Sequence, residues 1–262
     1  MGTAIFGVQD TELDGVMSAA SLLFRAGSRP GRAELRELAA RDAEFAVSLE
    51  PELPPITDPE GRTEWLELVM HGLTFDLAGL APREDAFLPE AAHLFGLPRD
   101  LTRQALEAVT LVPGPHLAGG RMLLPVLRSH ALLAARLTAL PGVVAVAWHP
   151  ARSWSAPDYF RTSVLRWLDG GAFPGLGLAA LTPTAGGGLV SEGLSLFTGQ
   201  ELMLEPGLTG DRAAGARIAL RLMHWLVENG ALETEEILTG PSGEHLRLEP
   251  AKDRRLIKVW KT

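Results

Sequence analysis

The sequence contains no cysteine among its 262 residues. That absence excludes disulfide bonds, a thiolate nucleophile, cysteine-ligated zinc and iron–sulfur clusters from this chain. Lysine is scarce as well, with 3 lysines beside 21 arginines, and acidic residues outnumber basic ones by 32 to 24. The resulting net charge of −8 disfavours a general phosphate-binding surface. Nucleic acid is therefore not an expected partner.

Long uncharged apolar runs are also missing. No stretch of about 18 apolar residues is free of charge, which argues against a membrane-spanning helix. The most apolar long stretch, residues 122–140, contains Arg128, His130 and Arg136. The first residues have no basic segment ahead of a long apolar run, so we expect no signal peptide. We therefore expect a cytoplasmic protein without a membrane partner.

Hydrophobic spacing along the chain predicts an α+β fold with a mixed, partly antiparallel sheet and helices mainly on one face. Apolar residues at helical spacing predict the helices 11–26, 32–43, 90–95, 119–140, 157–168 and 211–229. Short alternating or continuous apolar runs predict the strands 44–49, 65–69, 73–77, 108–112, 142–148, 176–181, 191–196, 201–205, 236–238, 244–248 and 256–260. His71 and Gly72 supply the turn of a hairpin between the second and third of these strands.

The division into lobes depends on the proline-containing, loop-like stretch 81–100. We place a boundary there, between an N-terminal α+β lobe of residues 1–100 and a C-terminal α+β lobe of residues 101–262, with one compact domain as the alternative. Three pairs of short segments in the chain resemble each other. They result either from an internal duplication or from chance in a chain rich in Leu, Ala, Gly and Pro. The similar segments are 77–82 and 178–183, 94–96 and 196–199, and 111–114 and 204–207.

Local signatures of phosphate binding, catalysis and metal binding are missing from the sequence. Residues 186–188 are not followed by the Gly-Lys-Ser of a Walker loop, and residues 193–197 lack the second glycine of a nucleophile elbow. The histidines stand singly, with no two of them three or four residues apart, so we expect no metal site on a helix face. We accordingly assign no catalytic residue, no metal ligand and no cofactor.

A dense group of polar and aromatic side chains follows the apolar run 142–148. It contains His149, Arg152, Trp154 and Tyr159. The end of a buried strand is a common place for a functional site, and these side chains stack on and hydrogen-bond planar or anionic ligands. We predict a ligand-binding site at these four residues. The competing interpretation assigns Trp154 to packing and His149 to a turn before the next helix.

Residues 193–205 read Gly-Leu-Ser-Leu-Phe-Thr-Gly-Gln-Glu-Leu-Met-Leu-Glu, between an apolar strand and a long helix. This segment resembles an uncharacterised bacterial family, a domain of unknown function whose members carry a Gly-Leu-x-x-Phe-Gly-x-x-Glu-Leu strand pair in that place. Thr198, inserted before Gly199, departs from the family's pattern. The resemblance covers residues 105–250 and implies an α+β fold in a bacterial cytoplasm. It implies no catalytic residues.

Two functions remain open at this point. The one we favour is a non-enzymatic protein-interaction or accessory module of the toxin-neutralising kind, whose partner is an unidentified protein or a second copy of the chain. The alternative is a small-ligand-binding protein or enzyme with its site near His149, Arg152 and Trp154. An interaction module should expose an apolar patch. A ligand-binding protein should have a concave pocket with converging polar groups and a perturbed pKa.

Overall fold

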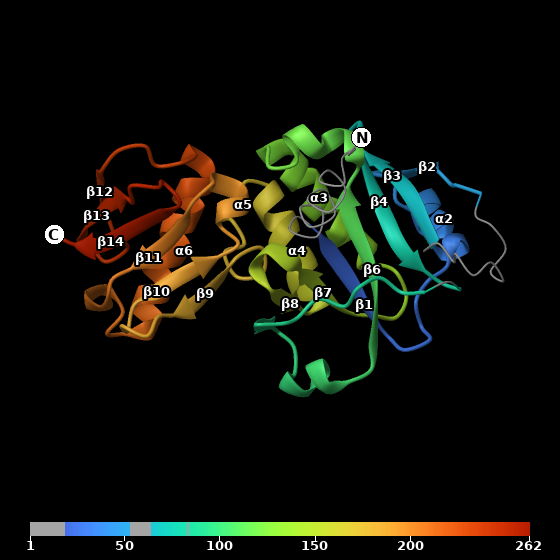
Figure 1. Ribbon diagram of the computed structural model, residues 1–262, viewed down its shortest axis with the longest axis horizontal. Coiled ribbons are helices and arrows are strands. Elements are labelled where there is room, and N and C mark those ends of the chain that lie inside the picture. The colour runs from blue at the N-terminus through green and yellow to red at the C-terminus, as the bar shows by residue number, and fades with distance from the viewer. Residues whose placement is uncertain (1–18, 53–63, 83) are drawn as a thin grey trace, which may run out of the picture.

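Two β-sheets form the framework of the protein (Figure 1). The computed structural model describes residues 19–52, 64–82 and 84–262. Within them the larger sheet contains β1 (Ala20–Arg25), β2 (Ala46–Leu49), β3 (Glu64–Met70), β4 (Leu73–Leu80), β5 (His93–Phe95), β6 (Leu106–Pro113), β7 (Val143–Trp148) and β8 (Ser153–Ser155). The smaller sheet contains β9 (Ala180–Pro183), β10 (Leu189–Glu192), β11 (Glu201–Leu204), β12 (Glu236–Thr239), β13 (His245–Pro250) and β14 (Leu256–Lys261).

The strand order is β2-β3-β4-β6-β1-β7-β8-β5 in the larger sheet and β12-β13-β14-β11-β10-β9 in the smaller one. In the larger sheet β5 pairs with β8 in parallel, and in the smaller sheet β11 pairs with β14 in parallel. The other neighbours, such as β1 with β6 and β13 with β14, are antiparallel. Both sheets are therefore mixed and mostly antiparallel.

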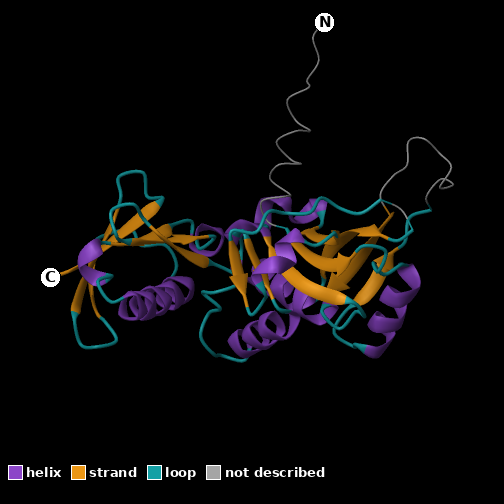
Figure 2. Cartoon of the chain, turned by 90° about the horizontal axis from the view of Figure 1, so that it is seen from below, coloured by secondary structure: helices purple, strands orange, loops and turns teal. Residues whose placement is uncertain are grey.

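The long helices lie on the same side of the two sheets (Figure 2). The α-helices are α2 (Arg32–Arg41), α3 (Leu124–Leu137), α4 (Pro157–Leu168), α5 (Ser195–Thr198) and α6 (Arg212–Asn229), and the 3₁₀ helices are η1 (Arg99–Arg103), η2 (Pro115–Gly120), η3 (His149–Ala151) and η4 (Pro206–Leu208). Helix α3 contacts β1, β6 and α4, while α6 contacts β10 and β11. No helix in the described part of the chain is long and apolar enough to cross a bilayer. The predicted α+β class is confirmed.

The predicted helix 11–26 is wrong where the structure describes it. The second half of that range forms the strand β1, which pairs with β6 on one side and β7 on the other, and residues 11–18 lie outside the described residues. The first five residues of β1 are all buried. A strand that is buried on both faces shows no polar–apolar alternation, so a short apolar run of this kind also fits a helix by its spacing.

Turn and cap residues explain why other elements occur where they were predicted. His71 and Gly72, at the tip of the β3–β4 hairpin, have φ angles of 54° and 76°, as a tight hairpin turn requires. Pro125 lies in the first turn of α3, where a proline costs no helical hydrogen bond. Gly230 ends α6 with a φ angle of 87°.

Three further short segments differ from their predictions. The expected helix 90–95 contains the short strand β5, which pairs with β8. The expected strand 176–181 starts only with β9 at Ala180. The expected strand 191–196 is divided into β10 and α5, because Gly193 has a φ angle of 86° and turns the chain between them. In each case tertiary pairing or one glycine determines the structure of fewer than seven residues.

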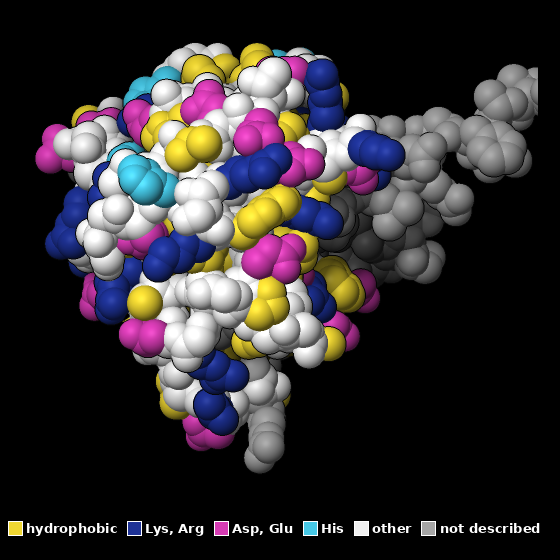
Figure 3. Space-filling view, turned by 90° about the vertical axis from the view of Figure 1, so that its left-hand side faces the viewer, with side chains coloured by type: hydrophobic (Ala, Val, Ile, Leu, Met, Phe, Trp, Pro, Cys, Tyr) yellow, Lys and Arg dark blue, Asp and Glu magenta, His cyan; other side chains and the backbone are white. Residues whose placement is uncertain are grey.

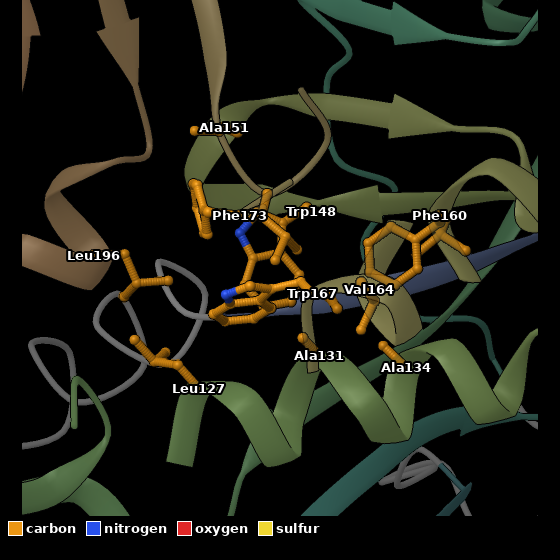
Figure 4. Packing of buried hydrophobic residues seen from close by; sticks show 14 of the residues in the cluster. Leu127, Ala131, Ala134, Trp148, Ala151, Phe160, Val164, Trp167, Phe173 and Leu196 are labelled. Atoms are coloured by element: carbon orange, nitrogen blue, oxygen red, sulfur yellow. The ribbon is translucent and has the colours of Figure 1, made fainter. Parts of the chain in front are cut away.

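A cluster of buried aromatic rings joins the two sheets. Trp148 on β7, Trp167 on α4 and Phe173 after α4 lie close together above α3 (Figure 4). Phe197 on α5 brings the smaller sheet into the cluster, with its ring centroid 4.9 Å from Phe173, 6.1 Å from Trp167 and 6.4 Å from Trp148. One continuous set of buried apolar side chains runs through both sheets. The two sheets therefore share a single hydrophobic core.

The two sheets divide the chain at another place than the predicted boundary between residues 1–100 and 101–262. β6, β7 and β8 come after residue 100 but belong to the same sheet as β1 and β4. β6 is even inserted between β4 and β1. The larger sheet uses residues 20–155 and the smaller one residues 180–261. The boundary predicted in the stretch 81–100 therefore lies within the larger sheet, and the shared core favours the alternative of one compact domain.

The internal duplication stays a prediction. The similar segments 111–114 and 204–207 both contain the end of a strand and lead through a 3₁₀ turn into a long helix, in the orders β6-η2-α3 and β11-η4-α6. The neighbouring strands differ, however. β4 pairs directly with β6, whereas β9 and β11 are separated by β10.

Candidate functional site

A cavity of about 580 Å³ lies between the two sheets. Its volume falls within the roughly 300–1,000 Å³ that small-molecule sites occupy. One wall comes from the η2–α3 connection and η3, and the other from the segment between β10 and β11 and from the β13–β14 turn. Its apolar lining includes Met122, Pro150 and Leu196, and its charged lining includes Glu192, Glu201 and Arg255.

Glu201 holds the segment between β10 and β11 in place. Its Oε1 accepts hydrogen bonds from the backbone N–H groups of Gly193 and Ser195, each at 3.0 Å. Its Oε2 accepts a hydrogen bond from the hydroxyl of Ser191, a buried residue. A carboxylate that accepts three such bonds already has its charge compensated by protein donors. Glu201 therefore shapes the cavity wall.

Glu192 connects the two sheets beside the cavity. From β10 it accepts the Nε–H of Arg152, which precedes β8, and the Nε2–H of His93 on β5, the latter at 3.0 Å. Burial acts to raise the pKa of Glu192, but the hydrogen bonds from Arg152 and His93 outweigh it and leave that pKa below its usual value. Glu192 is therefore ionised and paired at neutral pH. One lining carboxylate with a perturbed pKa is what a ligand-binding pocket is expected to contain.

Arg255 supplies positive charge to the wall. It is exposed and forms no ion pair with a carboxylate of the described residues, whereas the adjacent Arg254 pairs with Glu233. The Arg255 carbonyl accepts a hydrogen bond from the backbone N–H of Glu201 at 2.9 Å, which connects the β13–β14 turn to the neighbouring strand β11. Arg121 also lines the cavity. Both lining carboxylates are engaged by protein donors, so Arg255 is the lining charge that has no partner of opposite sign among the described residues.

The surface at the end formed by the smaller sheet has a different character. Acidic and basic side chains alternate there with scattered hydrophobic ones, without a broad patch of one sign (Figure 3). This face therefore gives no sign of the continuous basic surface that a nucleic-acid backbone requires.

Gly193, in the segment between β10 and β11, packs closely against Ala151 of η3. A Cβ atom on Gly193 would lie 2.9 Å from the Ala151 nitrogen and 3.0 Å from its Cα, and the φ angle is 86°. We expect Gly193→Ala to lower the free energy of unfolding by about 2 kcal/mol, from left-handed strain plus overpacking. Urea unfolding measures this. Gly199→Ala is the matched control, because Gly199 has a φ angle of 78° with no atom near a Cβ. Equal costs at the two glycines would contradict the packing between η3 and this segment.

Two of the four predicted site residues, His149 and Arg152, lie just after the end of β7, but their side chains are engaged by different partners. His149 bonds through Nε2 to the hydroxyl of Ser21 at 2.8 Å, and the side chain of Ser21 is buried. Arg152 is engaged by Glu192, in an ion pair that borders the cavity. Neither residue is in the cavity lining itself, although Pro150 between them is.

The other two predicted site residues point elsewhere. Trp154 is 3% exposed and packs on the opposite face of the larger sheet, in a second cluster with Leu23 and Ala147. Tyr159 donates its hydroxyl to the Leu176 carbonyl at 2.9 Å, and burial raises the pKa of Tyr159. The structure therefore does not bring His149, Arg152, Trp154 and Tyr159 together. The competing interpretation describes Trp154 better.

The cavity residues that the sequence analysis missed come from distant parts of the chain. Met122, Glu201 and Arg255 are each more than 50 residues from the next. One signal was present, since Gly193 and Glu201 both lie in the segment 193–205 that carries the family resemblance. The sequence pattern predicts a strand pair there, whereas in the structure the segment also forms a cavity wall.

Comparisons with known proteins add no functional assignment. No family model matches the chain, no curated protein matches it, and no solved structure matches it. In the described part of the chain, no three His, Asp or Glu side chains are grouped so that they could hold a metal ion. Function therefore has to be inferred from the cavity and its charges.

Proposed function

We propose that this protein binds a small organic molecule in the cavity between its two sheets. The observation that supports this function best is the cavity itself, at about 580 Å³, with one wall from the η2–α3 connection and η3 and the other from the smaller sheet and its connections. Interfaces between packed units are common places for ligands, and a mostly apolar wall with a few placed polar groups is the usual composition. The proposal moves the ligand site predicted near His149 and Arg152 to the adjacent cavity.

A thermal-shift screen against metabolites tests this function, with two variants of neighbouring residues. Met122 lines the cavity and is 50% exposed, so Met122→Trp should fold and fill part of the space. Leu123 is 62% exposed and is not in the lining, so Leu123→Trp is the matched control. We expect a ligand at a hundred times its Kd to add about 2.7 kcal/mol of stability to the wild type. Met122→Trp should remove most of that gain, and Leu123→Trp should keep it.

Two results would contradict the proposal. One is a ligand-induced shift that Met122→Trp leaves unchanged, which would place the ligand outside the cavity. The other is a screen without any shift in all three proteins. That second result is the one expected from an interaction module with a protein partner.

A protein-interaction or accessory function, which the sequence favours, is the second candidate. Its supporting observation is the pair Met122 and Leu123, two large apolar side chains that are 50% and 62% exposed next to one another. Contact surfaces expose apolar side chains, and such a pair could form part of one. The partner would be another protein or a second copy of the chain.

The cellular setting is also a proposal. A chain without cysteine needs no oxidising compartment, which supports a cytoplasmic location. The segment 193–205 supports a bacterial origin and a relation to the uncharacterised family that it resembles.

A further inference from the structure

We infer that the ligand of this cavity is an amphipathic organic anion, with one anionic head group bound near Arg255 and an apolar body against Met122, Pro150 and Leu196. This inference rests on the proposed function and specifies its ligand class. It follows from two independent features of the wall, namely its charge balance and the character of its uncharged lining.

The charge balance favours an anion. Of the two lining carboxylates, Glu192 is paired with Arg152 and His93, and Glu201 accepts three protein hydrogen bonds. Arg255 has no carboxylate partner among the described residues, as noted above. A cationic ligand would meet no open carboxylate, whereas a carboxylate or phosphate head would form a charge-assisted hydrogen bond with the guanidinium.

The uncharged lining favours an apolar body. Met122, Pro150 and Leu196 offer side chains without hydrogen-bonding groups, and Gly193 and Gly199 contribute backbone without a side chain. Ser195 adds a single hydroxyl group to this uncharged lining. A sugar or a nucleotide base would leave most of its polar groups without partners against such a wall, which costs binding energy. A hydrocarbon chain or ring loses only its contact with water, which favours binding.

Binding of decanoate, decanol and acetate, measured by isothermal titration calorimetry, tests the inference. We expect decanoate to bind, and decanol and acetate to bind at least about 10-fold more weakly because each lacks one half of the ligand. Arg255→Ala should weaken decanoate binding by roughly 10- to 100-fold, as expected for a lost hydrogen bond to a charged group. Arg255→Lys should recover part of this loss. Arg254→Ala is the matched control and should bind like the wild type, since Arg254 pairs with Glu233 outside the lining.

The outcomes separate this inference from the proposed function. Equal binding of decanoate and decanol, lost in both cases in Met122→Trp, would keep the cavity as the site and overturn the anionic head group. Decanoate binding unaffected by Arg255→Ala would overturn the inference as well. If decanoate does not bind while another compound gives a shift that depends on Met122, the inference falls and the proposed function stands. If no compound gives such a shift, both fall.

Discussion

Replacing Trp148 with alanine should lower the free energy of unfolding by about 3–5 kcal/mol, the range for removal of a buried aromatic side chain. Trp148 is 1% exposed, and its ring centroid lies 5.2 Å from His130 and 6.4 Å from both Phe160 and Phe197. These neighbours belong to α3, α4 and α5, so the cavity left by the truncation would lie where both sheets meet. Guanidinium chloride unfolding, followed by far-ultraviolet circular dichroism, measures the change.

The same experiment tests whether the two sheets unfold together. Because they share one core, both the wild type and Trp148→Ala should unfold in a single transition. Trp148→Phe should cost less than the alanine variant, because it keeps a ring and removes an Nε1–H that has no acceptor among the described residues. Trp260 on β14 is only half-buried, so Trp260→Ala is the control and should lower the free energy of unfolding by less than Trp148→Ala does. Two separate transitions in the wild type would contradict the shared core.

Acid should destabilise the protein through His130. This side chain is completely buried between Phe75 and Trp148, with its Nε2–H directed at the Leu111 carbonyl 3.2 Å away. Burial lowers the pKa of His130 from 6.5 to about 4. Between these two pH values the unfolded chain binds a proton at this residue that the folded chain does not. Stability therefore falls as the pH decreases through this window, by about 3 kcal/mol at pH 4.

Unfolding by urea between pH 7 and pH 4 measures this loss. His130→Gln keeps a hydrogen-bond donor for the Leu111 carbonyl but does not titrate, so the variant should lose about 3 kcal/mol less than the wild type over this range. The variant will also be less stable at pH 7, and only the difference in pH dependence bears on the prediction. His245→Gln, at an exposed position on β13, is the control and should follow the wild type. Identical pH dependence of the wild type and His130→Gln would contradict a neutral histidine in the core.

Elements with a local cause were predictable from the sequence. The β3–β4 hairpin depends on His71 and Gly72, and the end of α6 on Gly230, so in both cases neighbouring residues determine the backbone angles. β1 was not predictable in this way. Its strand conformation comes from pairing with β6 and β7, about 90 and 125 residues further along the chain, and these partners cannot be recognised from the spacing of its own apolar residues.

The candidate site was less predictable than the fold. The sequence predicts that neighbours such as Arg152 and Trp154 act together. In the structure Arg152 precedes β8 with a left-handed φ angle of 44° and pairs with Glu192, whereas Trp154, on β8, packs in the second cluster. The cavity instead combines Met122, Glu201 and Arg255 from three separated segments. Only the packing of the smaller sheet against the larger one brings them to one place, and that packing has no local signature.

The most direct test of the account is a crystal structure of the protein with 10-bromodecanoate, in which the anomalous signal of bromine locates the ligand. We expect a bromine peak inside the cavity, against Met122, Pro150 and Leu196, with the carboxylate of the same molecule at Arg255. A bromine peak elsewhere, or an empty cavity at a ligand concentration that saturates binding in solution, would contradict the assignment of the cavity as the binding site.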